Sequence, residues 1–315
     1  MQRGLSLVEL AQKIESNKGS KKDFVADTSQ VAIVPHREVR NDKIIDVPYI
    51  EVSNHGQFPI LPHAHDQIGA RVNIPSKYYD RMMADPNGGV QLLADNVNHW
   101  FRNNPEKRMV RTLGGNARAF LSNKYQRIEN EQIAEIALPV LADLPGVQIV
   151  SSEVTERRLY IQFIVPTVTG EVKRGDIVQA GGVIQNSEVG LGAYSVAGLI
   201  WRLVCLNGMK TTDAFRRTHV GRSVDEGELE WADDTMASDD QTVLLKMRDT
   251  IRAVVDETRF RATLDKMRGL TEGKITGNPV EAVGMLAQKV PVTESEKGGI
   301  LRALIEGGDL SAWGV

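Results

Sequence analysis

Cationic side chains interleaved with aromatic residues are the main chemical pattern in this sequence. From Phe101 to Arg127 the chain carries seven lysines and arginines against one carboxylate, Glu106. Single-stranded nucleic acid is bound by cations that follow its backbone and by aromatic faces on which its bases stack. The pattern favours a nucleic acid ligand, but a solvated charged face beside a packed core would also produce it. Six aromatic residues lie among the cations: Phe120, Tyr125, Tyr160, Tyr194, Trp201 and Phe215.

The expected phosphate contacts form a track of basic residues. The first part comes from a predicted hairpin and comprises Arg111, Arg118, Lys124 and Arg127, with Tyr125 as the stacking side chain. The second part lies farther along the chain and comprises Lys173, Arg174, Arg202, Arg216 and Arg217. The net charge is −3, so binding would depend on the local distribution of charge and not on the overall field.

An acidic segment from Asp225 to Asp240 indicates an alternative to nucleic acid binding. It carries eight carboxylates and no cation. Such a run imitates the charge of phosphates, and the protein would then be an interaction protein that inhibits a host DNA-binding or restriction system. The partner of this segment is left open.

A metal-dependent enzyme is a third hypothesis, which depends on His63, His65 and the carboxylates. Two histidines separated by one residue point to different faces of a helix but share a face of a strand, so only a strand would favour a metal site here. The sequence contains neither a glycine-rich nucleotide-binding fingerprint nor a nucleophile elbow. We therefore expect no cofactor, no metal and no enzymatic activity.

The densest apolar segment runs from Gly181 to Met209 and predicts two strands folded back on each other. Packing does not explain the polar residues at its tip. Because Glu188 suits phosphate binding poorly, Asn186, Ser187 and Glu188 are expected to contact a neighbouring subunit. Arg202 requires a buried partner or a DNA contact. The lone Cys205 is expected to be a small buried hydrophobic residue.

Other local patterns predict further elements. Ser6 and Glu9 form a capping box that opens a helix, which a charged linker from Asn17 to Asp23 follows. Glycines at 114 and 115 predict a hairpin between 107–113 and 117–121. One long helix is expected from about Asp239 to Met267. Two short helices follow, over 280–287 and 294–306, and a helix-turn-helix is an open interpretation of them.

The order of these elements predicts an α+β fold. We expect a central, mostly antiparallel sheet with helices packed on one face, in a main domain over residues 1–268. A small C-terminal helical segment would occupy residues 269–315. No apolar run approaches the length of a membrane span, and we expect a cytoplasmic protein without a membrane partner.

Three segments resemble a known family. They are HDQIGARVNIPSKYYDRM, ARAFLSNKYQRIENEQIAEIALPVL and GGVIQNSEVGLGAYSVAGLIWRLVCLNGM. Together they are similar to the phage/plasmid-like proteins grouped as domain of unknown function 932, found in prophages, phages and plasmids. The resemblance covers about Pro62 to Met209 and implies work on DNA, in recombination, replication or defence against restriction. The family usually continues beyond the Trp313-Gly314 pair, which implies that this chain is truncated at Val315.

The predicted strand-strand-strand-helix order also resembles the core of single-strand annealing proteins, which assemble as rings or filaments. The resulting hypothesis is a protein that binds single-stranded DNA and, by extension, anneals it as a homo-oligomer in a phage or plasmid setting.

Overall fold

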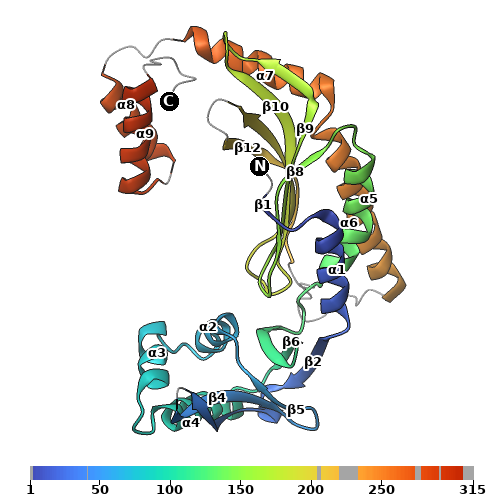
Figure 1. The fold of residues 1–315 in the computed structure, drawn as a ribbon. Helices are drawn as coiled ribbons and strands as arrows, with labels where there is room; N and C mark the ends of the chain where they lie inside the picture. The colour runs from blue at the N-terminus through green and yellow to red at the C-terminus, as the bar shows by residue number, and fades with distance from the viewer. Residues whose placement is uncertain are drawn as a thin grey trace.

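The computed structural model describes residues 3–40, 42–203, 207–219, 233–273, 278–290 and 292–307. The protein has an α+β fold, as the order of the predicted elements indicated (Figure 1). Its largest sheet has the strand order β1-β8-β9-β10-β11-β12, with strands β1 (Arg3–Gly4), β8 (Gln148–Val154), β9 (Leu159–Glu171), β10 (Ile177–Asn186), β11 (Tyr194–Arg202) and β12 (Asn207–Arg217).

Strands β8 to β12 form an antiparallel meander, in which each strand pairs with the next along the chain. The predicted hairpin is confirmed, because β10 pairs with β11 from Val178 opposite Arg202 to Gln185 opposite Ser195. Alternate residues of a strand point to opposite faces of the sheet. Leu159, Ile161 and Phe163 of β9 accordingly lie together in the main hydrophobic core.

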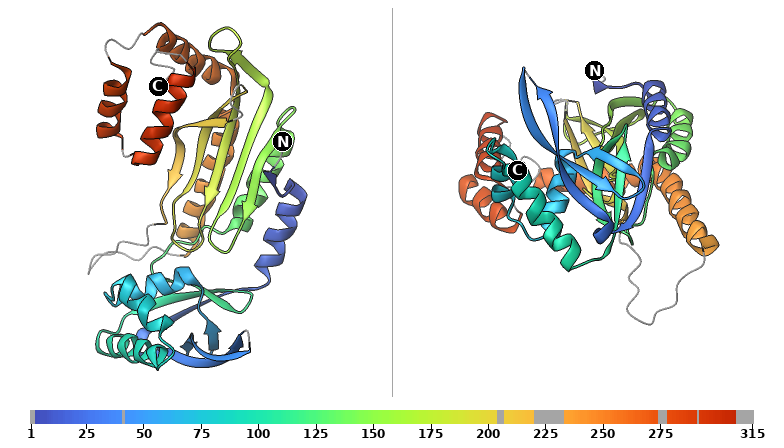
Figure 2. Two further views of the ribbon diagram at one scale, coloured as in Figure 1. Left: turned by 60° about the vertical axis from the view of Figure 1, so that its left-hand side comes forward. Right: turned by 90° about the horizontal axis from the view of Figure 1, so that it is seen from below.

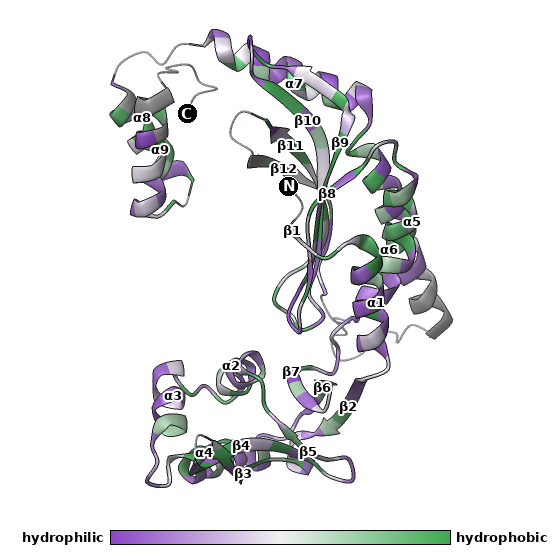
Figure 3. Ribbon diagram, viewed as in Figure 1, coloured by the Kyte–Doolittle hydropathy of each residue, from purple (hydrophilic) through white to green (hydrophobic). Residues whose placement is uncertain are grey.

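Helices cover one face of the large sheet (Figure 1). This layer includes α1 (Leu7–Lys18), α5 (Asn130–Asp143), α6 (Asp233–Ala253) and α7 (Glu257–Glu272). Met247 and Ile251 of α6 and Leu141 of α5 share a buried cluster with the sheet. Hydrophobic residues therefore dominate α5 and much of β10 (Figure 3). In the left view of Figure 2, α6 lies behind the sheet and the opposite face is turned to the viewer.

A second unit lies below the large sheet in Figure 1. One of its sheets has the order β2-β6-β7, and the other has the order β3-β4-β5. Val110, Phe120, Ile50 and Leu93 belong to its separate hydrophobic core. Its elements are β2 (Lys21–Asp27), β3 (Val31–Arg40), β4 (Lys43–Val52), β5 (Gly56–Pro59), α2 (Pro62–Arg71), α3 (Ser76–Ala84), α4 (Gly89–Asn103), β6 (Lys107–Leu113) and β7 (Asn116–Ser122). The range expected to be one main domain thus contains two large cores.

Three predicted elements differ from the structure. The expected linker from Asn17 to Asp23 is wrong, since Lys21 begins β2 and pairs with Leu113 of β6. The expected single helix ends at Ala253, and Asp256 caps a new helix by accepting from the backbone N–H of Arg259. Strand β12 follows the predicted hairpin and adds a strand to the expected core.

The two C-terminal helices are present as expected. They are α8 (Pro279–Lys289) and α9 (Glu294–Gly307), and Thr293 with Glu296 forms the capping box at the start of α9. The predictions for Cys205, for residues 225–232 of the acidic segment and for the chain end at Val315 lie outside the described residues. In the part of the chain that the structure describes, every helix is too short or too polar to cross a bilayer.

Candidate functional site

The loop between β10 and β11 inserts into the second unit of its own chain. Asn186, Ser187 and Glu188 are all buried, and their contacts are within this chain. The Asn186 side chain donates to the carbonyl oxygen of Ile128, and the Ser187 hydroxyl donates to that of Arg157. The predicted subunit contact is therefore corrected, because this chain itself buries the three residues.

Glu188 forms the centre of a buried ionic cluster. Its carboxylate lies 2.6 Å from Lys21 Nζ and 2.6 Å from Arg118 Nη1, and it accepts from the backbone N–H of Asn130 at 2.6 Å. Burial alone would raise the pKa of Glu188. The cations of Arg118 and Lys21, together with the Asn130 N–H, overcome burial and lower the pKa to about 2. Glu188 is therefore ionised at neutral pH.

Arg111 and Arg118 extend from the paired strands β6 and β7 toward this loop. Arg111 is 1% exposed and contacts Asp23 at 2.9 Å, the Glu188 carbonyl oxygen at 2.8 Å, and Glu129. Burial would lower the pKa of Arg111, but Glu129 and Asp23 raise it. Arg118 is 2% exposed. Both guanidinium groups are buried in internal ion pairs. The prediction that Arg111 and Arg118 contact phosphates is therefore corrected.

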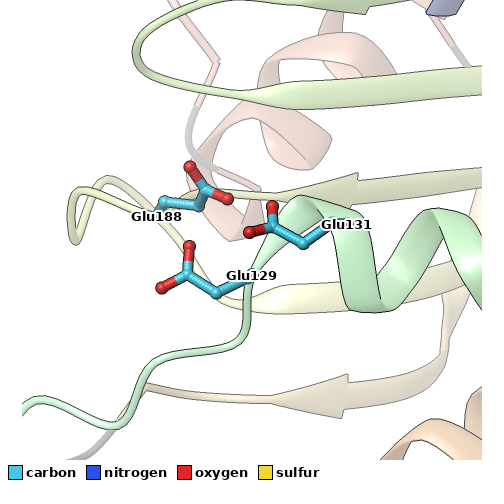
Figure 4. Close-up of side chains that lie close together, drawn as sticks. All are labelled: Glu129, Glu131 and Glu188. Atoms are coloured by element: carbon cyan, nitrogen blue, oxygen red, sulfur yellow. The ribbon is translucent and has the colours of Figure 1, made fainter. Parts of the chain in front are cut away.

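Three carboxylates converge beside the loop (Figure 4). Glu129 and Glu131 lie at the start of α5, and Glu188 reaches them from the β10–β11 loop. Lys21 Nζ lies 3.2, 2.6 and 2.6 Å from these three groups in that order. An ammonium group has three N–H donors, and here each donor meets one carboxylate. The lysine thus supplies the positive charge at the position that a metal ion would otherwise take.

Tyr125 does not present its ring as a free stacking surface. Its hydroxyl donates to the Ser187 carbonyl oxygen at 2.9 Å, and its ring stacks on the imidazole of His219, with 5.1 Å between ring centroids. Neighbouring Arg127 is 52% exposed and pairs with Asp23. Tyr125 therefore stabilises the position of the β10–β11 loop, whereas Arg127 lies at the surface.

The other predicted cations separate into two groups at opposite ends of the large sheet. Lys124, Arg127 and Arg216 are exposed near the β10–β11 loop, and Lys173 and Arg174 are exposed in the turn between β9 and β10. Two further arginines are held in ion pairs. Arg202 forms a bidentate pair with Asp176, and Arg217 pairs with Asp239. The structure therefore does not form one continuous basic track.

The two histidines of α2 have separate partners. Val189 offers only a carbonyl oxygen to His63 Nε2 at 2.8 Å, so this nitrogen carries a proton and donates. His65 Nδ1 lies 2.9 Å from the Tyr79 hydroxyl. Burial lowers the pKa of His65 to about 4, although a backbone hydrogen bond with Ile60 opposes this effect. His63 and His65 therefore do not form a common metal site on this helix.

The face of the large sheet opposite α1, α5, α6 and α7 carries aromatic and amide side chains. Among the described residues, no helix contributes to the apolar cluster of this face, which is called the helix-free face below. Ile164, Val183 and Leu199 form a small apolar cluster there, and the half-buried rings of Tyr160 and Trp201 pack against it. On neighbouring strands, Gln179 lies opposite Trp201, Gln185 opposite Ser195, and Gln162 opposite Val183. Aromatic rings beside amide groups are suited to flat, polar ligands.

The sequence patterns did not predict Lys21 and Asp23 as residues of the site, and they did not distinguish Trp201 from the other aromatic candidates. Residues 24–26 are all apolar, and this pattern could have indicated a strand that begins as early as Lys21. Trp201 was one of six aromatic candidates. Because both faces of β11 are apolar, the alternation in its sequence does not show which face lacks helices.

Comparisons with known proteins provide no relative. No family model matches the chain, and neither a curated protein nor a solved structure matches it. The resemblance to the phage/plasmid-like family therefore stays a prediction from the sequence motifs.

Proposed function

We propose that the protein binds single-stranded DNA across the helix-free face of its large sheet. The observation that carries this proposal is the position of Tyr160 and Trp201, whose half-buried rings lie on that face between two groups of exposed cations. Bases stack on aromatic side chains, while cations hold the phosphates on either side.

The two groups of cations lie far enough apart to hold several nucleotides. Strand β10 has 10 residues and lies between the group near Lys124 and the group near Arg174. At about 3.3 Å per residue, the groups are about 30 Å apart. Single-strand sites on small sheets and barrels accommodate about 4 to 16 nucleotides, which agrees with this length.

Annealing and self-association extend the proposal. In the part of the chain that the structure describes, β12 is one of the two outer strands of the large sheet, and the two-residue strand β1 is the other. An outer strand has backbone N–H and C=O groups that can pair with a second chain. Pairing of subunits through β12 would bring several single-strand sites together, and an annealing assembly in a phage or plasmid would use such an arrangement.

A salt series with a labelled single-stranded oligonucleotide tests the proposal. For single strands the logarithm of the binding constant falls by about 0.7 for each phosphate contact per tenfold increase in salt. Lys173→Gln with Arg174→Gln removes two contacts and should make this slope shallower by about 1.4. The matched control is Lys246→Gln with Arg252→Gln, two exposed cations of α6 on the helical layer, and its slope should equal that of the wild type.

A separate variant tests the stacking surface. Stacking of one base on an aromatic side chain contributes about 1–3 kcal/mol. Trp201→Ala should therefore weaken binding about 5- to 150-fold without changing the salt slope, because it removes no charge. The proposal fails if the wild type does not bind at low salt. It also fails if the test pair and the control pair of cations behave alike.

A further inference from the structure

A groove in the second unit is lined by two exposed aromatic rings. It lies where the end of α2, the start of α3 and the end of α4 meet (Figure 1). Its volume is about 370 Å³, which lies within the range of about 300–1,000 Å³ for pockets that hold small ligands. The groove is therefore large enough for one nucleotide base.

The two rings belong to Tyr78 of α3 and Trp100 of α4. Their exposed fractions are 45% and 44%, and every other described tyrosine, tryptophan or phenylalanine is less exposed. An exposed aromatic ring contributes little to the packing of its own chain, whereas it offers a large apolar surface to a partner. Because both rings line one groove, a flat ligand can contact both of them.

Two side-chain amides lie beside the rings. Asn73 and Asn104 also line the groove, both are exposed, and neither side chain has a hydrogen-bond partner among the described residues. An amide offers both donors and an acceptor, so it can pair with the polar edge of any base. The groove thus combines stacking surfaces with hydrogen-bonding groups that do not select one base.

The charge of the groove favours an anionic ligand. Its lining contains the cation of Arg71 and no carboxylate. Glu106, which pairs with Arg71, is also engaged by Arg108, so its negative charge is compensated. A negatively charged strand can therefore approach the groove without repulsion.

Two cations of α3 flank the ring of Tyr78. Lys77 and Arg81 are exposed, and neither forms an ion pair with a described residue. Tyr78 and Arg81 are three residues apart on the helix and hence share a face. Asp80 lies on another side of α3, where it lines a separate pocket with Asp66. Cations thus lie close to the exposed ring, as a site for a stacked base and its phosphates requires.

We infer that this groove is a second site for single-stranded DNA, in which one base stacks on the rings of Tyr78 and Trp100. The inference depends on the proposed ligand but not on the proposed sheet face, which lies in the other unit of the molecule. The unpaired cations favour a nucleic acid over a proline-rich peptide, which also binds aromatic grooves. Every base has an aromatic face, so the site should accept all four bases.

The fluorescence of Trp100 tests the groove directly. The chain has four tryptophans, so the test variant keeps Trp100 and carries phenylalanine at the other three positions. A ten-nucleotide single strand should quench this fluorescence, because a base stacks on the indole ring. Tyr78→Ala in the same variant removes one stacking surface and should weaken the binding measured at Trp100 by about 5- to 150-fold.

A pair of charge variants supplies the matched control. Lys77→Gln with Arg81→Gln should make the salt dependence of the quenching shallower by about 1.4, at about 0.7 for each phosphate contact. Lys246→Gln with Arg252→Gln should leave it unchanged, because these exposed cations lie on α6 in the other unit. Equal slopes for the two pairs would overturn the role of the α3 cations and with it the inferred site.

The outcomes separate this inference from the proposed function. If the strand binds the wild type without quenching Trp100, the groove site is wrong and single-strand binding is left intact. If the strand quenches Trp100 and Trp201→Ala binds as tightly as the wild type, the groove is supported and the sheet face is wrong. Quenching by a proline-rich peptide but not by the strand also overturns the inference. If no strand binds at low salt, the proposed function and this inference fail together.

Discussion

Glu188 shows how a buried carboxylate is kept ionised by its surroundings. It is 2% exposed and lies against two cations and one backbone N–H. Removing one partner of a buried ion pair is far more destabilising than removing an exposed one, because the remaining charge keeps its desolvation penalty. The side chain of Glu188 is therefore a structural centre of the molecule.

Substitution of Glu188 tests this role. Glu188→Gln leaves the buried Arg118 without a counterion and should lower the free energy of unfolding by about 3–5 kcal/mol. Denaturant titration measures the change. The control is Glu257→Gln, which removes an exposed pair with Arg261 and should cost at most about 0.5 kcal/mol. A similar loss in both variants would contradict the role of burial.

The pH dependence of stability follows from the pKa of the same residue. The pKa of Glu188 is about 2 in the folded protein, below its ordinary value of 4.5, so the stabilisation is complete above pH 4.5 and is lost as the pH falls toward 2. Burial raises the pKa of neighbouring Glu129, which gives a smaller contribution of opposite sign. Between pH 5 and 2.5 the wild type should lose free energy of unfolding more steeply than Glu188→Gln, as measured by titration at each pH.

At the scale of elements, two glycines of β10 allow close packing of strands and helices. A Cβ atom at Gly181 would overlap the backbone oxygen of Phe163 on β9. A Cβ atom at Gly182 would lie 2.6 Å from the Phe163 ring and 3.2 Å from Val254. These glycines are therefore required for packing and are not part of a nucleotide-binding loop.

Two glycine substitutions distinguish the destabilisation caused by a steric clash from the general effect of replacing glycine by alanine. Gly181→Ala should lower the free energy of unfolding by about 1–3 kcal/mol or more, since the backbone of β9 cannot move away easily. Gly192→Ala is the control, because nothing lies within 4 Å of the added methyl group. It should be neutral or slightly stabilising. Thermal unfolding of both variants measures the difference, and equal midpoints would contradict the close approach.

At the scale of the whole molecule, the ionic cluster joins two hydrophobic cores. One core lies between the large sheet and its helices, and the other lies within the unit formed by β2 to β7 and α2 to α4. The β10–β11 loop connects them, through Glu188 with Lys21 and through the Val189 carbonyl oxygen with His63 and Gln67. These contacts should make the two cores unfold together.

Two tryptophans report on this coupling. Trp100 lies on α4 in the second unit, and Trp201 lies on β11 of the large sheet. The chain has four tryptophans, so one variant keeps Trp100 alone and the other keeps Trp201 alone, with the remaining three replaced by phenylalanine. The denaturation curves of the two variants should coincide, as expected for a single cooperative transition. Glu188→Gln added to both variants should separate the curves. Curves that already differ without Glu188→Gln would show that the cluster does not couple the cores.

The sequence by itself determined the local elements and the fold class. The capping box of Ser6 and Glu9 and the hairpin across Gly114 and Gly115 depend on contacts within a few residues, and both are present. Apolar density likewise located the β10–β11 hairpin correctly. Such features are readable because the interacting groups are neighbours in the chain.

Only the tertiary structure decided which charged groups are available. Lys21 and Glu188 are separated by 167 positions in the chain, yet they meet within hydrogen-bonding distance. Arg111 and Arg118 have the same residue type as exposed Arg127, but chain folding places carboxylates against them and removes them from solvent. A sequence shows where the cations are, whereas their availability depends on distant segments that pack over them. The same reason explains why the packing of the helices, and not the pattern of β11, left Trp201 on the open face.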